Sequence, residues 1–226
     1  MAAPRLGVVT FGHSGGPQLG DDLGASLPGC EIYEQGLLDD VPEASLLAWR
    51  VGPASAEGTV VHLRDGRELT IESAPLLDRV APALERLAAA RPQVVLYGCA
   101  GPLPAYPAPA RALAVRPQQV LQDYVAATVR RGRIGMVVPS PLHVEPTKHA
   151  YAAPGRTVAA VAVPPADREA VLAAASALGA DGAEVVILGC FDHPLRDLLA
   201  AQSVTGRPVV SSRQLAIDAV RGLLFQ

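Results

Sequence analysis

The stretch Arg133-Ile-Gly-Met-Val-Val-Pro-Ser140 repeats the pattern of Arg5-Leu-Gly-Val-Val-Thr-Phe-Gly12, and this repetition decides the fold. A second pair of segments, Val94-Val-Leu-Tyr-Gly-Cys99 and Val185-Val-Ile-Leu-Gly-Cys190, follows in the same order. Short apolar runs of this kind are typical of buried strands in a parallel sheet. We therefore predict two related α/β halves that arose by duplication. Chance similarity between buried strands is the alternative, but it does not predict a cysteine at the same strand end in both halves.

Strands and helices alternate along the rest of the chain, as in a sheet that helices cover on both faces. Several helical stretches begin with proline, which suits the first turn because its missing N–H would have no partner there. Strands are predicted at residues 6–11, 31–34, 94–98, 134–138, 158–163, 184–188 and 208–211. Helices are predicted near residues 18–27, 75–90, 117–131, 141–152, 165–178, 194–201 and 213–224.

One segment breaks this alternation. In Val60-Val-His-Leu-Arg-Asp-Gly-Arg-Glu-Leu-Thr-Ile71, the pair Asp65-Gly66 separates two alternating runs, which strongly indicates a β-hairpin. Between its first strand and its strand-end cysteine, the first half contains more residues than the second half does. The additional residues lie at this hairpin and its flanks. The expected fold class is α/β, with two pseudo-symmetric three-layer halves, mainly parallel sheets and a β-hairpin insertion in the first half. The expected halves are residues 1–115 and 116–212, with the C-terminal helix 213–226 packed back on the first.

The composition excludes several classes of protein. The 226 residues include 19 basic and 22 acidic side chains, so the net charge of −3 lacks the positive excess of a nucleic-acid-binding protein. Half of the residues are apolar and the mean hydropathy is +0.25, which is enough to form a core. No apolar run approaches the roughly 18–20 residues of a membrane span, and Leu6 to Phe11 is too short for a signal peptide. We expect a cytoplasmic protein that binds neither nucleic acid nor membranes.

The cysteines and the lysine limit the cofactor chemistry. Cys30, Cys99 and Cys190 are odd in number and widely spaced, so we expect free thiols, with a structural role for Cys30. The one lysine, Lys148, has no pyridoxal phosphate signature around it. The glycines from Gly12 to Gly16 lack the order of a nucleotide-binding loop. We therefore expect no cofactor.

Cys99 and Cys190 are the strongest catalytic candidates. Ligands of parallel sheets collect beyond the carboxyl ends of the strands, where backbone N–H groups point into a crevice. A helix N-terminus there would lower the thiol pKa, so we predict a resting state of one thiolate facing one thiol. Two opposed thiols can remove a proton from one face of a carbon and deliver a proton to the other face. The same pair could support decarboxylation or cis-trans isomerisation. A role as small buried hydrophobes is the alternative.

Polar residues at the other strand ends are candidates for substrate binding. His193 could tune the Cys190 thiol or relay a proton, with Asp192 orienting it; alternatively, Asp192 caps the next helix. Cys190-x-x-His193 offers two metal ligands, but no second close pair completes a zinc pattern, so we expect no metal. Ser140, Ser211 and Ser212 could equally be helix caps. The predicted substrate-binding set is Thr10, Gly12, His13, Ser14, Ala100, Gly101, Pro139, Ser140, Phe191, Asp192 and His193, with Ser211 and Ser212 as further strand-end candidates.

The segment before Arg116 shows no helical periodicity, because Pro102, Pro104, Pro107 and Pro109 punctuate it. We expect it to be ordered, either as a lid over the rim of the cleft or as a connection between the halves. A plain linker is the alternative.

Two segments of the chain resemble parts of glutamate racemases. The segment around the second cysteine, Leu188-Gly-Cys-Phe-Asp-His-Pro-Leu195, is similar to the second cysteine segment of those enzymes. The segment Phe11-Gly-His-Ser-Gly-Gly16 is similar to their early glycine-rich loop. Over nearly its whole length, the chain resembles the AroM family, which belongs to the aspartate/glutamate racemase superfamily. The matching segments are Thr10-Phe-Gly12 with Pro17, Tyr33-Glu-Gln-Gly-Leu-Leu-Asp39, Leu63-Arg-Asp-Gly66, Cys99-Ala-Gly101, Arg133-Ile-Gly-Met-Val-Val-Pro139 and Cys190. This resemblance implies a fold and a cleft more firmly than a reaction.

Two departures from the family patterns concern substrate binding. The superfamily usually has Asn-Thr or Thr-Gly after the first cysteine, where it helps to hold a substrate carboxylate, and Ala100-Gly101 lacks that side-chain donor. Pro17-Gln18 stands where the AroM pattern has Pro-Arg, so a cation is missing. Both departures argue against a free amino acid as substrate. Backbone N–H groups near Cys99 to Gly101 and Phe191 to Asp192 could still bind a carboxylate or an oxyanion.

The sequence thus favours a cofactor-independent racemase or epimerase, with Cys99 and Cys190 as its acid/base pair and the ligand between the halves. Its expected substrate is a small molecule that carries a carboxylate or an activating carbonyl group. The alternatives are a decarboxylase or cis-trans isomerase on the same scaffold, or a non-catalytic metabolite-binding protein, which has no need for a lowered thiol pKa. Relatives with this fold often form homodimers, so a homodimer is one option for the assembly.

Overall fold

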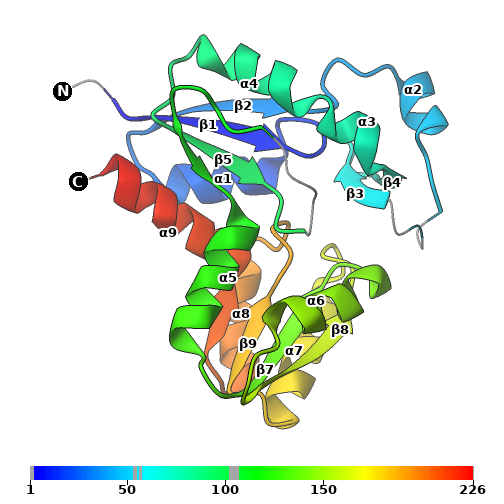
Figure 1. Cartoon of the computed structure of the whole chain (residues 1–226), viewed down its shortest axis with the longest axis vertical. Coiled ribbons are helices and arrows are strands. Elements are labelled where there is room, and N and C mark those ends of the chain that lie inside the picture. The colour runs from blue at the N-terminus through cyan, green and yellow to red at the C-terminus, as the bar shows by residue number, and fades with distance from the viewer. Residues whose placement is uncertain (1–2, 53–54, 56–57, 102–106, 226) are drawn as a thin grey trace. The chain divides into compact units, whose positions relative to one another are not determined.

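The structure is a computed structural model of the 226-residue chain, and it describes residues 3–52, 55, 58–101 and 107–225 (Figure 1). The chain divides into two compact units. The first contains Met1–Gly98, Leu103–Arg116 and Ala219–Gln226, and the second contains Cys99–Pro102 and Pro117–Asp218. None of the described helices is both long enough and apolar enough to cross a membrane.

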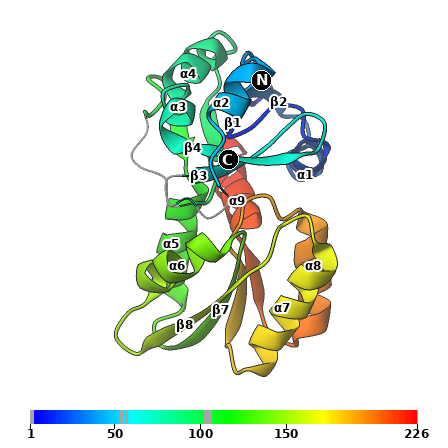
Figure 2. The ribbon, with the colours of Figure 1, turned by 90° about the vertical axis from the view of Figure 1, so that its right-hand side faces the viewer.

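The first unit is built on a four-stranded parallel sheet in the order β2-β1-β5-β6. Thr10, at the end of β1, lies opposite Gly36 of β2 and Gly98 of β5, so three strands end at one edge of the sheet. Helices α1 and α4 cover opposite faces (Figures 1 and 2). The strands are β1 (Arg5–Thr10), β2 (Glu31–Gly36), β5 (Val94–Gly98) and β6 (Leu113–Val115), and the helices are α1 (Pro17–Ser26) and α4 (Val80–Ala88).

A hairpin is inserted between β2 and α4, as the sequence predicts. Strands β3 and β4 are antiparallel, and Gly66 in their turn has a φ of 85°, which favours glycine. Val61 and Ile71 are fully buried, so the alternating pattern gives the hairpin one apolar face. The inserted elements are α2 (Glu43–Ala48), β3 (Gly58–His62), β4 (Glu68–Glu72) and α3 (Ser73–Leu77).

The second unit contains a parallel sheet in the order β10-β9-β7-β8. In chain order, its strands occupy the same places as those of the first sheet, with the first strand between the second and the third. This arrangement confirms two α/β halves of similar topology, with an insertion in the first. The strands are β7 (Gly132–Val138), β8 (Arg156–Ala162), β9 (Val185–Leu188) and β10 (Val209–Ser211); the helices are α5 (Pro117–Thr128), η1 (Pro141–His143), α6 (Val144–Tyr151), α7 (Arg168–Ala180), α8 (Leu195–Thr205) and α9 (Ser212–Leu224).

Alternating side chains divide the core of the second unit between the two faces of its sheet. Val137 and Leu188 pack with residues of α7 and α8, whereas Met136 and Ile187 pack with residues of α5 and α6. Helix α5 therefore covers the second sheet, although it follows β6 in the chain. Conversely, α9 follows β10, but its residues from Ala219 onward belong to the first unit.

Several predicted boundaries differ from those of the structure. The helix predicted at 75–90 is two helices, α3 and α4, and the one predicted at 141–152 begins with the short η1 turn. Helix α7 begins at Arg168 rather than at Pro165, because the Asp167 carboxylate accepts a hydrogen bond from the Ala170 N–H at 3.1 Å and caps it. Strand β6 and helix α2 were not predicted, since three and six residues are too few to show a period.

The predicted lid or connection lies partly outside the described residues, at 102–106. Beyond this gap, the Tyr97 hydroxyl donates a hydrogen bond to the Pro107 carbonyl oxygen at 2.7 Å. The Arg116 guanidinium lies 5.4 Å from the centre of the Tyr97 ring. These two contacts attach both ends of the segment 107–116 to Tyr97 of β5, within the first unit.

Candidate active site

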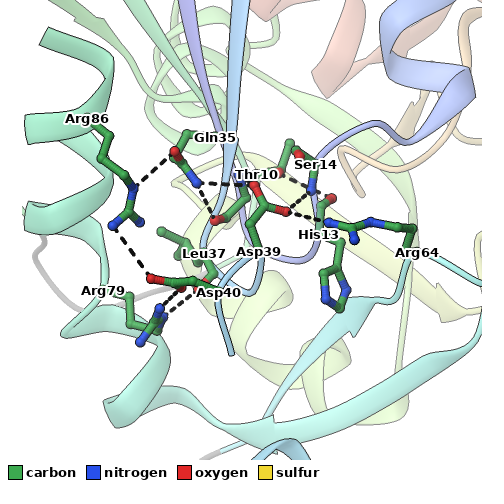
Figure 3. Close-up of polar contacts among 11 residues, drawn as sticks. Thr10, His13, Ser14, Gln35, Leu37, Asp39, Asp40, Arg64, Arg79 and Arg86 are labelled. Atoms are coloured by element: carbon green, nitrogen blue, oxygen red, sulfur yellow. Dashed lines mark hydrogen bonds and ion pairs between the residues drawn. The ribbon is translucent and has the colours of Figure 1, made fainter. Parts of the chain in front are cut away.

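In the first unit, Asp39 holds together the loops that follow β1 and β2 (Figure 3). Its Oδ1 accepts a hydrogen bond from the backbone N–H of Ser14 at 2.8 Å. Its Oδ2 accepts hydrogen bonds from the Gly36 N–H at 2.8 Å and from Gln35 Nε2 at 3.1 Å. Arg64, on the hairpin turn, approaches Oδ1 to 3.5 Å. One carboxylate therefore fixes the path of the loop that carries the candidate residue Ser14.

Two glycines allow the close approach of these loops. A Cβ on Gly12 would lie 2.5 Å from the carbonyl oxygen of His62, on the hairpin. A Cβ on Gly36 would lie 2.6 Å from Asp39 Oδ1 and 2.7 Å from the Gly12 carbonyl oxygen. Any larger residue would have to push backbone atoms apart. Close packing therefore requires glycine at position 12, and the role of Gly12 in substrate binding stays a prediction.

Replacing Asp39 by alanine should destabilise the first unit. The substitution leaves the N–H groups of Ser14 and Gly36 without their acceptor, which should cost about 2 kcal/mol of unfolding free energy. Urea unfolding measures this loss. Asp21→Ala, at an exposed position of α1, is the matched control and should change stability by less than about 0.5 kcal/mol. Equal effects of both substitutions would contradict the structural role of Asp39.

Two arginines attach the helices after the hairpin to the end of β2. Arg79 Nε donates a hydrogen bond to the Leu37 carbonyl oxygen at 2.6 Å, and its guanidinium also pairs with Asp40. Arg86 Nε donates to Gln35 Oε1 at 3.0 Å (Figure 3). Sequence reasoning did not select this network as a site. The segments 33–39 and 63–66, which carry the AroM resemblance, supply much of it and were the available signal.

Glu34, Thr10 and His13 offer further polar groups at this strand end. Burial raises the pKa of Glu34, and hydrogen bonds from the Gly15 backbone and the Thr10 hydroxyl oppose that rise. The Thr10 hydroxyl, which has a single proton to donate, also lies 3.4 Å from the His13 carbonyl oxygen. Glu34 Oε1 and His13 Nδ1 are buried and have no hydrogen-bond partner among the described residues. Glu34 is therefore a ligand-binding candidate that the sequence did not reveal.

In the second unit, Cys99 and Cys190 are half-buried free thiols whose electrostatic environments are linked. Cys190 Sγ lies 3.6 Å from Asp192 Oδ2, and the Gly101 N–H donates to Cys99 Sγ at 3.4 Å. The negative charge of Asp192 raises the pKa of both thiols. The interaction with Cys99 also raises the pKa of Cys190. Asp192 thus acts on both sulfur atoms, and each thiolate would disfavour the other.

The structure reverses the expected direction of the thiol pKa shifts. Burial, with smaller contributions from Asp192, raises the pKa of Cys99 to about 12 and that of Cys190 well above its ordinary value. Helix α8, which was expected to lower the pKa of Cys190, begins only at Leu195, five residues further along the chain. Both groups are therefore thiols at neutral pH, and the predicted resting thiolate is wrong.

His193 is fully buried, and neither ring nitrogen has a hydrogen-bond partner in the part of the chain that the structure describes. Burial lowers its pKa to about 4, against the opposing charges of Asp192 and Asp197, so the ring is neutral at pH 7. Asp192 does not orient the ring by a hydrogen bond, as had been expected. It does not cap α8 either, since the N-cap residue is Pro194 and no side chain caps that helix.

The remaining candidates divide between structural roles and open polar groups. Ser140 Oγ caps η1 by accepting from the Leu142 N–H at 3.2 Å, and Ser211 Oγ accepts from the Gln214 N–H at 3.4 Å at the start of α9. Ser212 Oγ is buried and has no partner within the described residues. Pro139, Ala100 and Gly101 are half-buried at strand ends.

Phe191 has a structural role beside the second cysteine. Its side chain is buried, and the Arg213 guanidinium lies 5.3 Å from the centre of its ring. Arg213 Nε also donates a hydrogen bond to the Phe191 carbonyl oxygen at 2.7 Å. These contacts fix the backbone between Cys190 and His193. For metal ions, the described residues contain no group of three or more His, Cys, Asp or Glu side chains suitably placed to bind one.

Comparison with known proteins supports the fold. A family model described as AroM protein matches residues 6–224. Glutamate racemase isoform RacE1 from Bacillus anthracis is similar in structure, with a TM-score of 0.61, 15% identity, and coverage of 99% of this chain and 82% of the racemase chain. Maleate cis-trans isomerase from Nocardia farcinica gives a TM-score of 0.61 and 18% identity over 98% of this chain and 92% of its own.

An arylmalonate decarboxylase is also similar, with a TM-score of 0.59 and 14% identity over 99% of this chain and 94% of its own. No curated protein matches the chain in sequence. At these identities, the structural similarities show a shared fold, and three different activities occur on it.

Proposed function

This chain belongs to the AroM family, and we propose that it is a cofactor-independent isomerase, a racemase or epimerase that uses Cys99 and Cys190 to exchange protons with a carbon atom of a small substrate. The observation that carries the proposal is that one cysteine follows the third strand, in chain order, of each of two similar sheets. Cys99 directly follows β5, and Cys190 comes two residues after the end of the equivalent strand β9. Enzymes that share this fold include a racemase and an isomerase.

The reaction needs one thiolate and one thiol. The thiolate takes a proton from the stereogenic carbon, and the electron pair of the C–H bond stays on carbon and its activating group. The thiol then gives its proton to the opposite face of that carbon, so that the configuration inverts and the two cysteines exchange protonation states. The next turnover runs in the opposite direction or follows exchange of protons with solvent.

The raised pKa values define what a substrate must supply. Both cysteines are thiols at neutral pH, so substrate binding has to favour removal of one proton. The Gly101 N–H already donates to Cys99 Sγ and opposes the rise in its pKa. A bound group that brings a positive charge or hydrogen-bond donors to a sulfur atom would act in the same direction.

The test is deuterium incorporation from D₂O, followed by proton NMR and chiral chromatography. The substrates are single enantiomers of small 2-hydroxy acids, because Ala100 and Gln18 argue against a free amino acid. Aspartate, glutamate and their side-chain amides are tested beside them to check that expectation. We expect one substrate to yield its enantiomer with one deuterium at the stereocentre. Release of carbon dioxide from phenylmalonate, or conversion of maleate to fumarate, without exchange of this kind would instead identify a decarboxylase or a cis-trans isomerase.

A non-catalytic binding protein is the second candidate, and the raised thiol pKa values favour it. We expect iodoacetamide to label Cys99 and Cys190 at pH 8 at least about tenfold more slowly than glutathione, with rates that rise up to pH 10, because only the thiolate reacts. Mass spectrometry of the labelled peptides measures each rate, and urea-unfolded protein is the control. Labelling as fast as that of glutathione would contradict the raised pKa values.

The two candidate functions differ in their response to a ligand. A catalytic pair must form a thiolate in every turnover, so a bound substrate should undergo deuterium exchange even though the free thiols label slowly. A binding protein should be stabilised by its ligand without any exchange.

A further inference from the structure

Strand β8 forms one edge of the sheet in the second unit, and β7 is its only neighbour among the described strands. The N–H of Val163, directly after β8, donates to the Val138 carbonyl oxygen of β7 at 2.8 Å. Backbone groups of successive residues point to opposite sides of a strand, so the odd-numbered residues of β8 bond to β7. The outward residues, whose N–H and carbonyl groups have no backbone partner within the described part of the chain, are Val158, Ala160 and Ala162.

The other edges of the two described parallel sheets are protected against pairing with a further strand. Strands β6 and β10 are three residues long, and β2 carries Glu31 and Glu34. Strand β8 is seven residues long, and from Thr157 to Ala162 it contains neither a charged residue nor proline. Its first residue, Arg156, turns inward, since its Nε donates to the Tyr151 carbonyl oxygen at 2.6 Å. A long edge strand without charge or proline is a surface that pairs with another strand.

A groove of about 450 Å³ lies along this edge, so the described residues leave room beside the strand. Its two cationic side chains are both neutralised. Lys148 Nζ lies 2.7 Å from Glu145 Oε1, and Arg133 pairs with Asp181. A groove without excess positive charge favours a neutral partner over a polyanion such as a nucleic acid. The residues that line it are Arg133, Lys148, Thr157, Val158, Ala159 and Ala160.

We propose that β8 is the contact surface of a homodimer, in which β8 of a second copy lies antiparallel to it. A two-fold axis through Ala160 pairs Val158 of one copy with Ala162 of the other, so that all outward residues of both copies gain hydrogen-bond partners. Val161, whose side chain is 40% exposed, then lies opposite Ala159 of the other copy. Small apolar side chains therefore meet small apolar side chains across the contact.

Helix α6 makes a second copy the partner of matching charge. Tyr151 of this helix packs in one cluster with Val158 of β8, so α6 covers that face of the edge strand. Lys148 of α6 lines the groove, together with its partner Glu145. The two-fold axis sets the α6 helices of the two copies antiparallel, which turns Lys148 of each toward Glu145 of the other. Opposite charges then meet across the contact, which favours this partner over an unrelated strand.

Sedimentation equilibrium on the full chain tests the association. We expect the mass at about 500 µM to approach twice the 23.4 kDa of one chain, and at about 5 µM to approach a single chain, because a small interface binds weakly. Val161→Lys should raise the Kd at least about tenfold, because it places two ammonium groups near the two-fold axis. Leu199→Lys is the matched control, at a 68% exposed position of α8, which packs beside β10 at the opposite edge. It should associate as the unmodified protein does.

Hydrogen exchange followed by NMR locates the contact. At about 500 µM, the N–H groups of the three outward residues should exchange at least about tenfold more slowly in the unmodified protein than in Val161→Lys. The N–H groups of Thr157 and Ala159, which bond to β7, should exchange slowly in both proteins, and this shows that the variant keeps its sheet.

Three results would overturn the proposal. They are the mass of a single chain at about 500 µM, a dimer that Leu199→Lys weakens as much as Val161→Lys does, and equal exchange of the outward N–H groups in the unmodified protein and Val161→Lys. A single chain whose outward N–H groups exchange slowly would show that another part of the same chain covers the edge. None of these measurements depends on the chemistry of Cys99 and Cys190, so their outcome leaves the proton-exchange proposal as it stands.

Discussion

Serine in place of Cys99 or of Cys190 is expected to lower the rate of racemisation by a factor of about 10²–10⁴, the usual contribution of a positioned acid or base. A hydroxyl has nearly the same size as a thiol, but it is far less acidic, so it can neither form the base nor give up a proton at a useful rate. The measurement is loss of optical rotation in D₂O with the substrate found for the unmodified protein. Cys30→Ser, at a half-buried position outside the proposed pair, is the matched control and should remain active.

The direction of exchange separates a two-base mechanism from a general loss of function. Each variant keeps one thiol, which can still remove the proton from the enantiomer that presents it on that side. We therefore expect Cys99→Ser and Cys190→Ser to retain slow exchange with opposite enantiomers, without inversion. If both variants exchanged the same enantiomer, or if either racemised at the normal rate, the proposed roles of the two cysteines would be wrong.

A fall in pH from 6.5 to 4 is expected to lower the free energy of unfolding by about 3 kcal/mol through the titration of His193. The pKa of this group is lowered to about 4 in the folded protein, whereas an unfolded histidine has a pKa of about 6.5. Between these values the unfolded state binds the proton and the folded state does not. The unfolding free energy therefore rises with pH across this window, and the full cost is reached below pH 4.

Comparison with His193→Gln isolates this contribution, because Glu34, whose raised pKa has the opposite effect on the pH dependence, is common to both proteins. Urea unfolding at pH 4, 5, 6 and 7 should show that the unmodified protein loses stability relative to the variant as the pH falls. His149→Gln, at an exposed position on α6, is the control for removing a histidine. Parallel stability curves for the unmodified protein and His193→Gln would contradict the low pKa.

The sequence predicted the architecture well because strands and turns are encoded locally. The run from Val94 to Gly98 is apolar and β-branched, and it forms strand β5 over those residues. Asp65-Gly66 forms the hairpin turn, since glycine accepts the positive φ there. The repeated strand patterns gave two sheets of the same strand order. Strand β6, by contrast, is three residues long and is defined only by its pairing with β5.

The candidate residues were predicted less completely than the fold. The sequence identified Cys99, Cys190 and His193 by their places at strand ends. It did not identify Asp39, which joins Gly36, at the end of β2, to Ser14, in the loop after β1. A carboxylate that accepts a backbone N–H group from a distant segment leaves no periodic signal in the chain.

The sequence alone determined the parallel strands, the duplicated halves, the hairpin insertion and the strand-end positions of Cys99 and Cys190, because each depends on residues close together in the chain. Only the tertiary structure decided the protonation of those thiols and the neutrality of His193. The physical reason is that a pKa depends on how much solvent is excluded and on which charges lie nearby, such as that of Asp192. The atoms that exclude the solvent come from distant segments, so no local pattern records their effect.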